Sequence, residues 1–92
     1  MRNKILIEAV VKAGMFPNER AVVIHTTDGD KSLFAGEDWT REIDGRQYLC
    51  VELLEEANDV LLVLLPDEII GGVRTVTVQR NLRREFDTAS AR

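Results

Sequence analysis

Four arginines toward the end of the chain are the residues best suited to bind a charged partner: Arg74, Arg80, Arg83 and Arg84. A guanidinium group binds phosphate or carboxylate through a planar fork of donors. Nucleic-acid-binding modules usually combine a basic domain with aromatic stacking residues, and here only Phe86 lies near the arginines. We therefore expect the arginines to pair with acidic strands of their own domain. Protein binding and nucleic-acid binding are the alternatives.

Cys50 and His25 are the only cysteine and the only histidine, so they are the only possible thiol–imidazole pair. Both fall within apolar runs that read as strands, which places them in or near the core. Acyl-transfer chemistry would also need an orienting group and an oxyanion site, and the sequence offers no motif for either. We predict an inert buried thiol and no catalytic residues.

Two acidic groups and one glycine pair have weak similarity to ligand-binding motifs. Asp28-Gly29-Asp30 begins like a calcium loop, but position twelve of that loop would be Trp39 where a glutamate is required. Gly71-Gly72 lacks the spacing of either phosphate-binding motif. The acidic group around a turn reads as a solvated tip, and its members are Glu52, Glu55, Glu56 and Asp59. We predict no cofactor and no metal.

Trp39 is the remaining candidate for a binding role. It stands in a polar stretch beside charged residues, and tryptophan is enriched at binding hot spots. A lone tryptophan in a small domain also commonly folds back onto the core. The sequence leaves both interpretations open.

Composition and charge limit the class of protein. The chain has 92 residues with 45% hydrophobic and 30% charged side chains, which is typical of one folded domain. The net charge is −4, but residues 1–70 carry 7 Lys or Arg against 14 Asp or Glu, while residues 71–92 carry 5 Arg against 2 acids. A single cysteine favours a reducing, cytoplasmic location, and no apolar run approaches a membrane span, so we expect neither export nor membrane insertion.

Short apolar runs separated by turn residues predict an all-β domain. The runs are 4–13, 21–27, 31–35, 47–55, 59–65 and 73–80, with 36–44 read as a loop. Asp28-Gly29 and Asp44-Gly45 are hairpin signals. In the last run, Val76 and Val78 alternate with polar residues and are expected to face inward.

The stretch 49–65 permits two interpretations. Its apolar residues also fit a helical stripe, but Asn58-Asp59 would lie in the middle of that helix, where both are poor helix formers. A hairpin with its turn at 56–59 is the preferred interpretation. The predicted fold is a five- to six-stranded antiparallel, partly closed barrel of SH3-like or OB-like kind over residues 1–84, followed by a polar tail over 85–92. The alternative is an α+β fold with one helix around 49–65.

By elimination, these observations favour a non-enzymatic cytoplasmic module that binds a protein, or a second copy of itself, through Trp39 or an exposed strand edge. A small nucleic-acid-binding barrel that uses Arg80, Arg83 and Arg84 is one alternative. An accessory subunit of an enzyme complex is the other.

Overall fold

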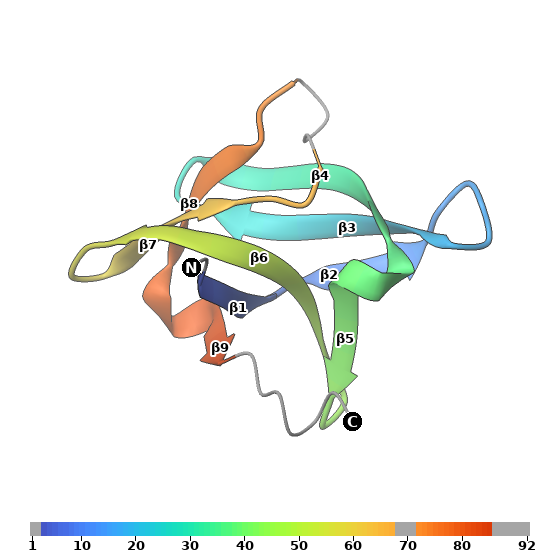
Figure 1. Cartoon of the computed structure of the whole chain (residues 1–92), viewed down its shortest axis with the longest axis horizontal. Coiled ribbons are helices and arrows are strands. Elements are labelled where there is room, and N and C mark those ends of the chain that lie inside the picture. Colours follow the sequence, from blue (N-terminus) through green and yellow to red (C-terminus); the bar gives the residue numbers. More distant parts are fainter. Residues whose placement is uncertain (1–2, 68–71, 86–92) are drawn as a thin grey trace.

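The computed structural model describes residues 3–67 and 72–85, and this part of the chain is built almost entirely of strands (Figure 1). In chain order the elements are β1 (Asn3–Glu8), β2 (Val10–Ala13), β3 (Glu19–Thr26), β4 (Gly29–Gly36), the 3-10 turn η1 (Glu37–Trp39), β5 (Thr40–Ile43), β6 (Arg46–Glu56), β7 (Val60–Leu64), β8 (Thr75–Gln79), the 3-10 turn η2 (Arg80–Leu82) and β9 (Arg83–Glu85).

The strands form two antiparallel sheets. The larger has the order β8-β7-β6-β1-β9, with β5 also paired to β6, and the smaller has the order β2-β3-β4. The sheets meet at Ala9, where the chain passes from β1 into β2, and at Thr27, whose amide donates to the carbonyl of Thr77 on β8 at 3.0 Å. Within the described residues the sheets do not close into a continuous barrel. The prediction of an all-β antiparallel fold is confirmed.

The main core lies between the two sheets, and the period-two alternation of the strands fills it. Ile5 and Ile7 of β1, Leu49 and Val51 of β6, and Val76 and Val78 of β8 all point into it. Because successive side chains on a strand face opposite sides, Leu6, Tyr48 and Cys50 form a second small cluster on the outer face of β1 and β6, with Ile43 packed against it. These two central strands are therefore covered on both faces.

The turns follow the sequence signals. Between β5 and β6, Asp44 and Gly45 both have positive φ, at 54° and 79°, which is the backbone that a two-residue hairpin turn of type I′ requires. Residues 49–65 form a hairpin whose turn covers residues 57–59, so the hairpin interpretation is confirmed and the helical alternative is wrong.

Three sequence expectations need correction. The single strand expected over 4–13 is divided at Ala9, because the chain changes sheets there. The loop expected over 36–44 contains η1 and β5, which pairs with β6. The last strand was expected over 73–80, but the arginine-rich segment after it contains β9, which pairs with residues 5–7 of β1. β5 and β9 are short strands of mostly polar and charged residues with little burial, so they lack the apolar alternation by which a strand is recognised in the sequence.

Two further expectations were a polar tail over residues 85–92 and no membrane-spanning segment. Glu85 ends β9, and the rest of the expected polar tail lies outside the described residues, as does Gly71. Among the residues that the structure describes, no helix has the length and apolar character to cross a membrane.

Candidate interaction surface

Strand pairing places Trp39 beside Cys50. In the β5–β6 ladder Thr40 is opposite Leu49, so Trp39, one residue earlier, comes level with Cys50. In the β1–β6 ladder Lys4 is opposite Glu52 and Leu6 opposite Cys50, which puts Lys4 on the same outer face. The ammonium group of Lys4 lies over the indole ring, 5.0 Å from its centroid. Such a cation–π contact holds the ring in place at an exposed site.

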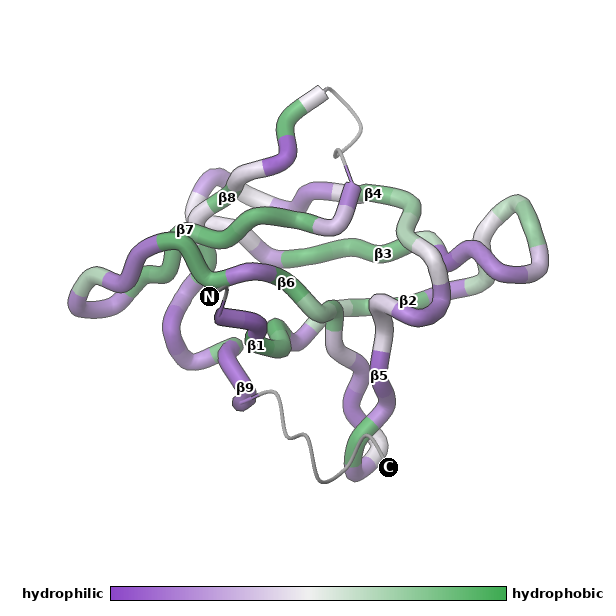
Figure 2. The backbone as a smooth tube through the Cα atoms, viewed as in Figure 1, coloured by the Kyte–Doolittle hydropathy of each residue, from purple (hydrophilic) through white to green (hydrophobic). Residues whose placement is uncertain are grey.

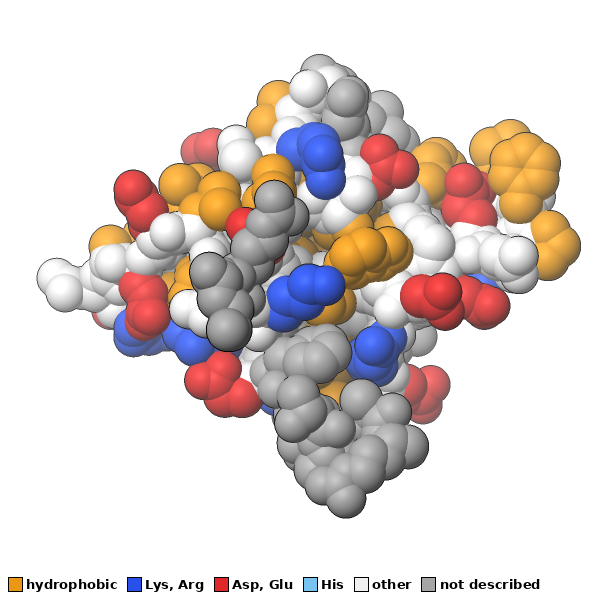
Figure 3. Space-filling view, viewed as in Figure 1, with side chains coloured by type: hydrophobic (Ala, Val, Ile, Leu, Met, Phe, Trp, Pro, Cys, Tyr) orange, Lys and Arg blue, Asp and Glu red, His pale blue; other side chains and the backbone are white. Residues whose placement is uncertain are grey.

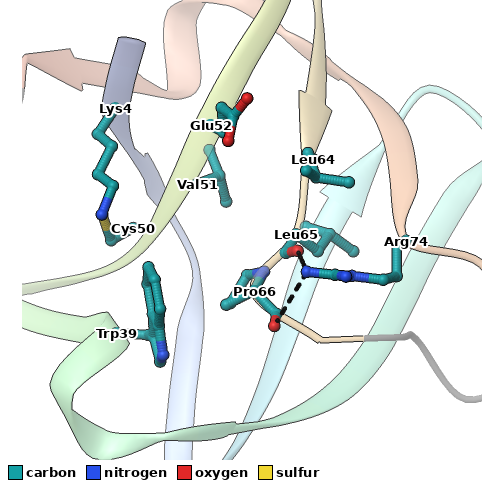
Figure 4. Close-up of a pocket in the computed structure, with 9 residues that line it drawn as sticks. All are labelled: Lys4, Trp39, Cys50, Val51, Glu52, Leu64, Leu65, Pro66 and Arg74. Atoms are coloured by element: carbon teal, nitrogen blue, oxygen red, sulfur yellow. Dashed lines mark hydrogen bonds between the residues drawn. The ribbon is translucent and has the colours of Figure 1, made fainter. Parts of the chain in front are cut away.

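Two adjoining hollows open around this tryptophan, and we call them together the Trp39 groove. Figure 4 shows the residues that line the smaller one. Their volumes are about 130 and 300 Å³, and Lys4, Trp39 and Cys50 line both. The smaller also has an apolar wall made by Leu64, Leu65 and Pro66. Trp39 is 38% exposed. The structure thus places it neither wholly in the core nor free on the surface, but as one wall of a groove.

The groove has charged residues at its rim. Arg74 closes the smaller hollow and donates to the carbonyl oxygens of Leu65 and Pro66 at 3.0 and 3.3 Å, as the dashed lines of Figure 4 mark. Arg41 lines the larger hollow and donates to the carbonyl of Asp38 at 2.6 Å. Glu52 and Asp38 supply acid at the same rim. The result is an apolar floor with mixed charge around it.

Cys50 is buried, as the sequence predicts. Burial raises the pKa of the Cys50 thiol because the thiolate would lose its solvation, and the nearby charges of Lys4 and Arg41 offset only part of this. A raised pKa leaves little thiolate at neutral pH, so this group is a poor nucleophile.

His25 does not join Cys50, and its predicted burial is wrong. It lies on β3 in the smaller sheet, with its side chain 59% exposed, and bonds to Asp30 across the β3–β4 hairpin. β3 has one face in the core and one in solvent, and His25 falls on the solvent face. Within residues 3–67 and 72–85, no group of three His, Cys, Asp or Glu side chains is arranged to hold a metal ion.

The arginine segment is held by carboxylates of the same domain. Arg80 and Arg83 both contact the Glu56 carboxylate at the β6–β7 turn, the second at 3.4 Å. The hydrogen bond from Arg80 is the main reason that the pKa of Glu56 is lowered. Arg84 lies 3.8 Å from Asp44 and stacks over the ring of Tyr48, 5.7 Å from its centroid. Arg80, Arg83 and Arg84 thus lie beside carboxylates of the domain, as expected. Arg74 differs, because its hydrogen bonds go to the backbone carbonyls of Leu65 and Pro66.

The β2–β3 loop carries a feature that the sequence interpretation missed. We call residues Gly14–Asn18 the β2–β3 tip. Its Met15 and Phe16 are the most exposed large hydrophobic residues among those described, at 77% and 66%. The loop projects from one end of the molecule, where Figure 2 colours its outer part as hydrophobic. In Figure 3 hydrophobic side chains gather at the same end. The sequence does contain a signal for this feature, because Met15 and Phe16 come directly before Pro17-Asn18, a pair that is typical of exposed turns.

Backbone hydrogen bonds fix the shape of this tip. The amide of Gly14 donates to the carbonyl of Glu19, and the amide of Glu19 donates to the carbonyl of Phe16, both at 3.0 Å. The Glu19 carboxylate accepts from the amide of Met15 at 3.0 Å. A Cβ on Gly14 would lie 2.7 Å from the Glu19 carbonyl oxygen, so this close approach requires glycine.

The tip is also anchored to the turn that carries Trp39. The amide of Glu37 donates to the carbonyl of Asn18 at 2.8 Å, and Arg20 pairs with the Glu37 carboxylate at 2.9 Å. Glu37 begins η1, and Trp39 ends it. The tip and the Trp39 groove are therefore joined through one three-residue turn.

Comparisons of the chain with family models, with curated proteins and with solved structures give no match.

Proposed function

We propose that this domain is a non-enzymatic protein-interaction module, located in the cytoplasm, whose anchor is the β2–β3 tip. The observation that carries the proposal is the exposure of Met15 and Phe16 on a loop whose backbone is fixed by hydrogen bonds. A rigid loop loses little conformational freedom when it binds, and large apolar side chains that enter a partner's pocket supply much of the binding free energy.

The surroundings of the anchor support a protein partner. Residues 14–18 carry no charge, so no charged group of the tip would lose its solvation on burial. Trp39 and its groove are connected to the anchor through η1, and they add to the surface that a partner could cover. The unpaired, buried Cys50 suits a reducing compartment.

Nucleic acid is a less favourable partner for this surface. Arg80, Arg83 and Arg84 each lie next to a carboxylate, which reduces the positive field that a phosphate backbone would meet. Titration with labelled single- and double-stranded DNA and RNA at about 150 mM salt is expected to show no saturable binding tighter than about 1 μM.

A photo-crosslinking amino acid at position 15, introduced in cells of the source organism, tests the proposal. We expect a covalent adduct with a protein, identified by mass spectrometry. The matched control carries the same amino acid at position 54, because Leu54 is also an exposed hydrophobic residue, 42% exposed, but lies on β6. No adduct at position 15, or equal adducts at both positions, would contradict the proposal.

A further inference from the structure

The β2–β3 tip and the Trp39 groove match each other in size, and the smaller hollow of the groove also has an apolar wall. A cavity of roughly 150 Å³ lined by apolar side chains accommodates a benzene ring. The smaller hollow of the groove, about 130 Å³, is close to this size, and Trp39 and Pro66 provide apolar walls there. The larger hollow, about 300 Å³, adjoins it at Trp39, and a larger share of its lining residues is charged. Phe16 has a phenyl ring that no part of its own domain covers well.

The tip of one molecule does not fill its own groove. Neither Met15 nor Phe16 lines either hollow, and both remain mostly exposed. Within residues 3–67 and 72–85 the tip therefore leaves the groove open to a side chain of another molecule.

We infer that the partner is a second copy of this chain, in a two-fold dimer in which the tip of each copy enters the Trp39 groove of the other. This inference rests on the proposed function and names its partner. Because η1 joins the tip to the groove, both contacts lie near one another on each copy. A two-fold axis close to η1 then satisfies both contacts at once and closes the assembly at two copies, where a head-to-tail contact would continue into longer chains.

Charge does not oppose this arrangement. The tip brings no charge of its own, and at the rim that it would meet Lys4, Arg41 and Arg74 lie among the carboxylates of Asp38 and Glu52. An anionic lipid surface suits the tip less well, since the chain has a net charge of −4 and Arg20, close to the tip, is paired with Glu37.

The size of the interface sets the expected affinity. An aromatic side chain buries about 150–250 Å², so two exchanged tips and their grooves give an interface at the low end of specific complexes. Dissociation in the micromolar range follows, at about 1–100 μM.

Analytical ultracentrifugation across about 1 μM to 1 mM protein tests the dimer. The wild-type mass should rise from 10.4 kDa to twice that value and stop there. Phe16→Ser and Trp39→Ala should each weaken association about tenfold or more, whereas Leu54→Ser should not. An equal mixture of Phe16→Ser and Trp39→Ala should associate more strongly than either alone, because the intact tip of one meets the intact groove of the other.

Trp39 fluorescence gives a second measurement that leaves the groove unaltered. Trp39 is the only tryptophan, so its emission should shift to longer wavelength as wild type or Leu54→Ser is diluted, and should be independent of concentration in Phe16→Ser. A monomer at all concentrations, a mass that rises beyond two copies, or variants that fail to complement would each overturn the dimer. A crosslink from position 15 to a different protein would also overturn it, yet would leave the proposed function standing.

Discussion

The β6–β7 turn and the β2–β3 tip lie at opposite ends of the molecule in Figure 1, and different interactions stabilise them. The β6–β7 turn is acidic, and its Glu56 is tied by Arg80 and Arg83 to η2 and β9. The β2–β3 tip is uncharged at residues 14–18, and backbone hydrogen bonds at Gly14 and Phe16 close it. The charged side chains that support it, Glu19 and Arg20, lie after the tip and contact its backbone.

The difference distinguishes side chains that hold the fold together from side chains that are exposed and can contact a partner. At the β6–β7 turn the carboxylate is occupied, since it connects the hairpin to the C-terminal part of the fold. At the β2–β3 tip the backbone closes the loop, so Met15 and Phe16 contribute little to its shape and remain accessible to a partner. The predictions below test that separation through the free energy of unfolding.

The largest loss in the free energy of unfolding is expected for a core residue on β8, the strand next to the β6–β7 hairpin. Val78 is fully buried on β8 and is opposite Leu61 of β7. Val78→Ala should lower the free energy of unfolding by about 1–3 kcal/mol, because it removes apolar burial and leaves a partial cavity. Urea denaturation measures this change.

The exposed residue Thr75 on the same strand is the matched control, and Thr75→Ala should change the free energy of unfolding by less than about 0.5 kcal/mol. Thr77 is unsuitable, because its hydroxyl bonds to that of Thr27 and links the two sheets. Equal losses for Val78→Ala and Thr75→Ala would mean that the inward face of β8 is assigned wrongly.

The next largest effect concerns the shape of the β2–β3 tip. Gly14→Ala places a methyl group against the backbone of Glu19, so the closing turn must shift. We expect a loss of about 1–2 kcal/mol in the free energy of unfolding, together with weaker self-association. Gly36→Ala is the control, since its Cβ would meet only Trp39 at an ordinary 3.7 Å. If Gly14→Ala were as stable as Gly36→Ala, the tip would not depend on this close approach.

Much of the fold could be predicted from local pattern. Alternation located the inward face of β8 at Val76 and Val78, and Asn58-Asp59 located the β6–β7 turn. β5 and β9 could not be found this way, since each is a short, mostly polar strand that exists because a long neighbour, β6 or β1, offers it an edge. Such pairing is a tertiary effect that a local window does not contain.

The candidate surface was only partly predictable. Trp39 was identified from its residue type, but its neighbours in the groove come from β1, β6 and the segment after β7, which only the strand register brings together. His25 was misplaced because alternation on β3 alone does not say which face is buried. Met15 and Phe16 were not identified, because two apolar residues before Pro17-Asn18 do not show by themselves whether the body of the domain covers them.

Acid should weaken the β6–β7 turn selectively. The lowered pKa of Glu56 means that the folded state favours its charged form, mainly through the hydrogen bond from Arg80. This stabilisation is present above the ordinary glutamate pKa of about 4.3 and is lost as pH falls through the lowered folded value. The difference in free energy of unfolding between wild type and Glu56→Gln should therefore shrink from pH 7 to about pH 3. A difference that is constant with pH would exclude the ion pairs as its source.

The smallest effect on stability is expected at the side chains proposed as the anchor. The double variant Met15→Ser/Phe16→Ser should change the free energy of unfolding of the monomer by no more than about 0.5 kcal/mol. Folding leaves both side chains mostly exposed, so their removal forfeits little apolar burial and opens no cavity. The hydrogen bonds of the tip at these positions use the amide of Met15 and the carbonyl of Phe16, which serine retains.

Urea denaturation at a concentration below the expected association range isolates this effect, because binding between folded copies would otherwise add to the apparent stability of the wild type. At higher concentration the wild type should become more resistant than the double variant, and that gap should grow with protein concentration. A loss above about 1 kcal/mol in the monomer would show that Met15 and Phe16 support the fold. In that case the β6–β7 turn and the β2–β3 tip would both depend on side-chain contacts within the domain. Met15 and Phe16 would then not be available to bind a partner.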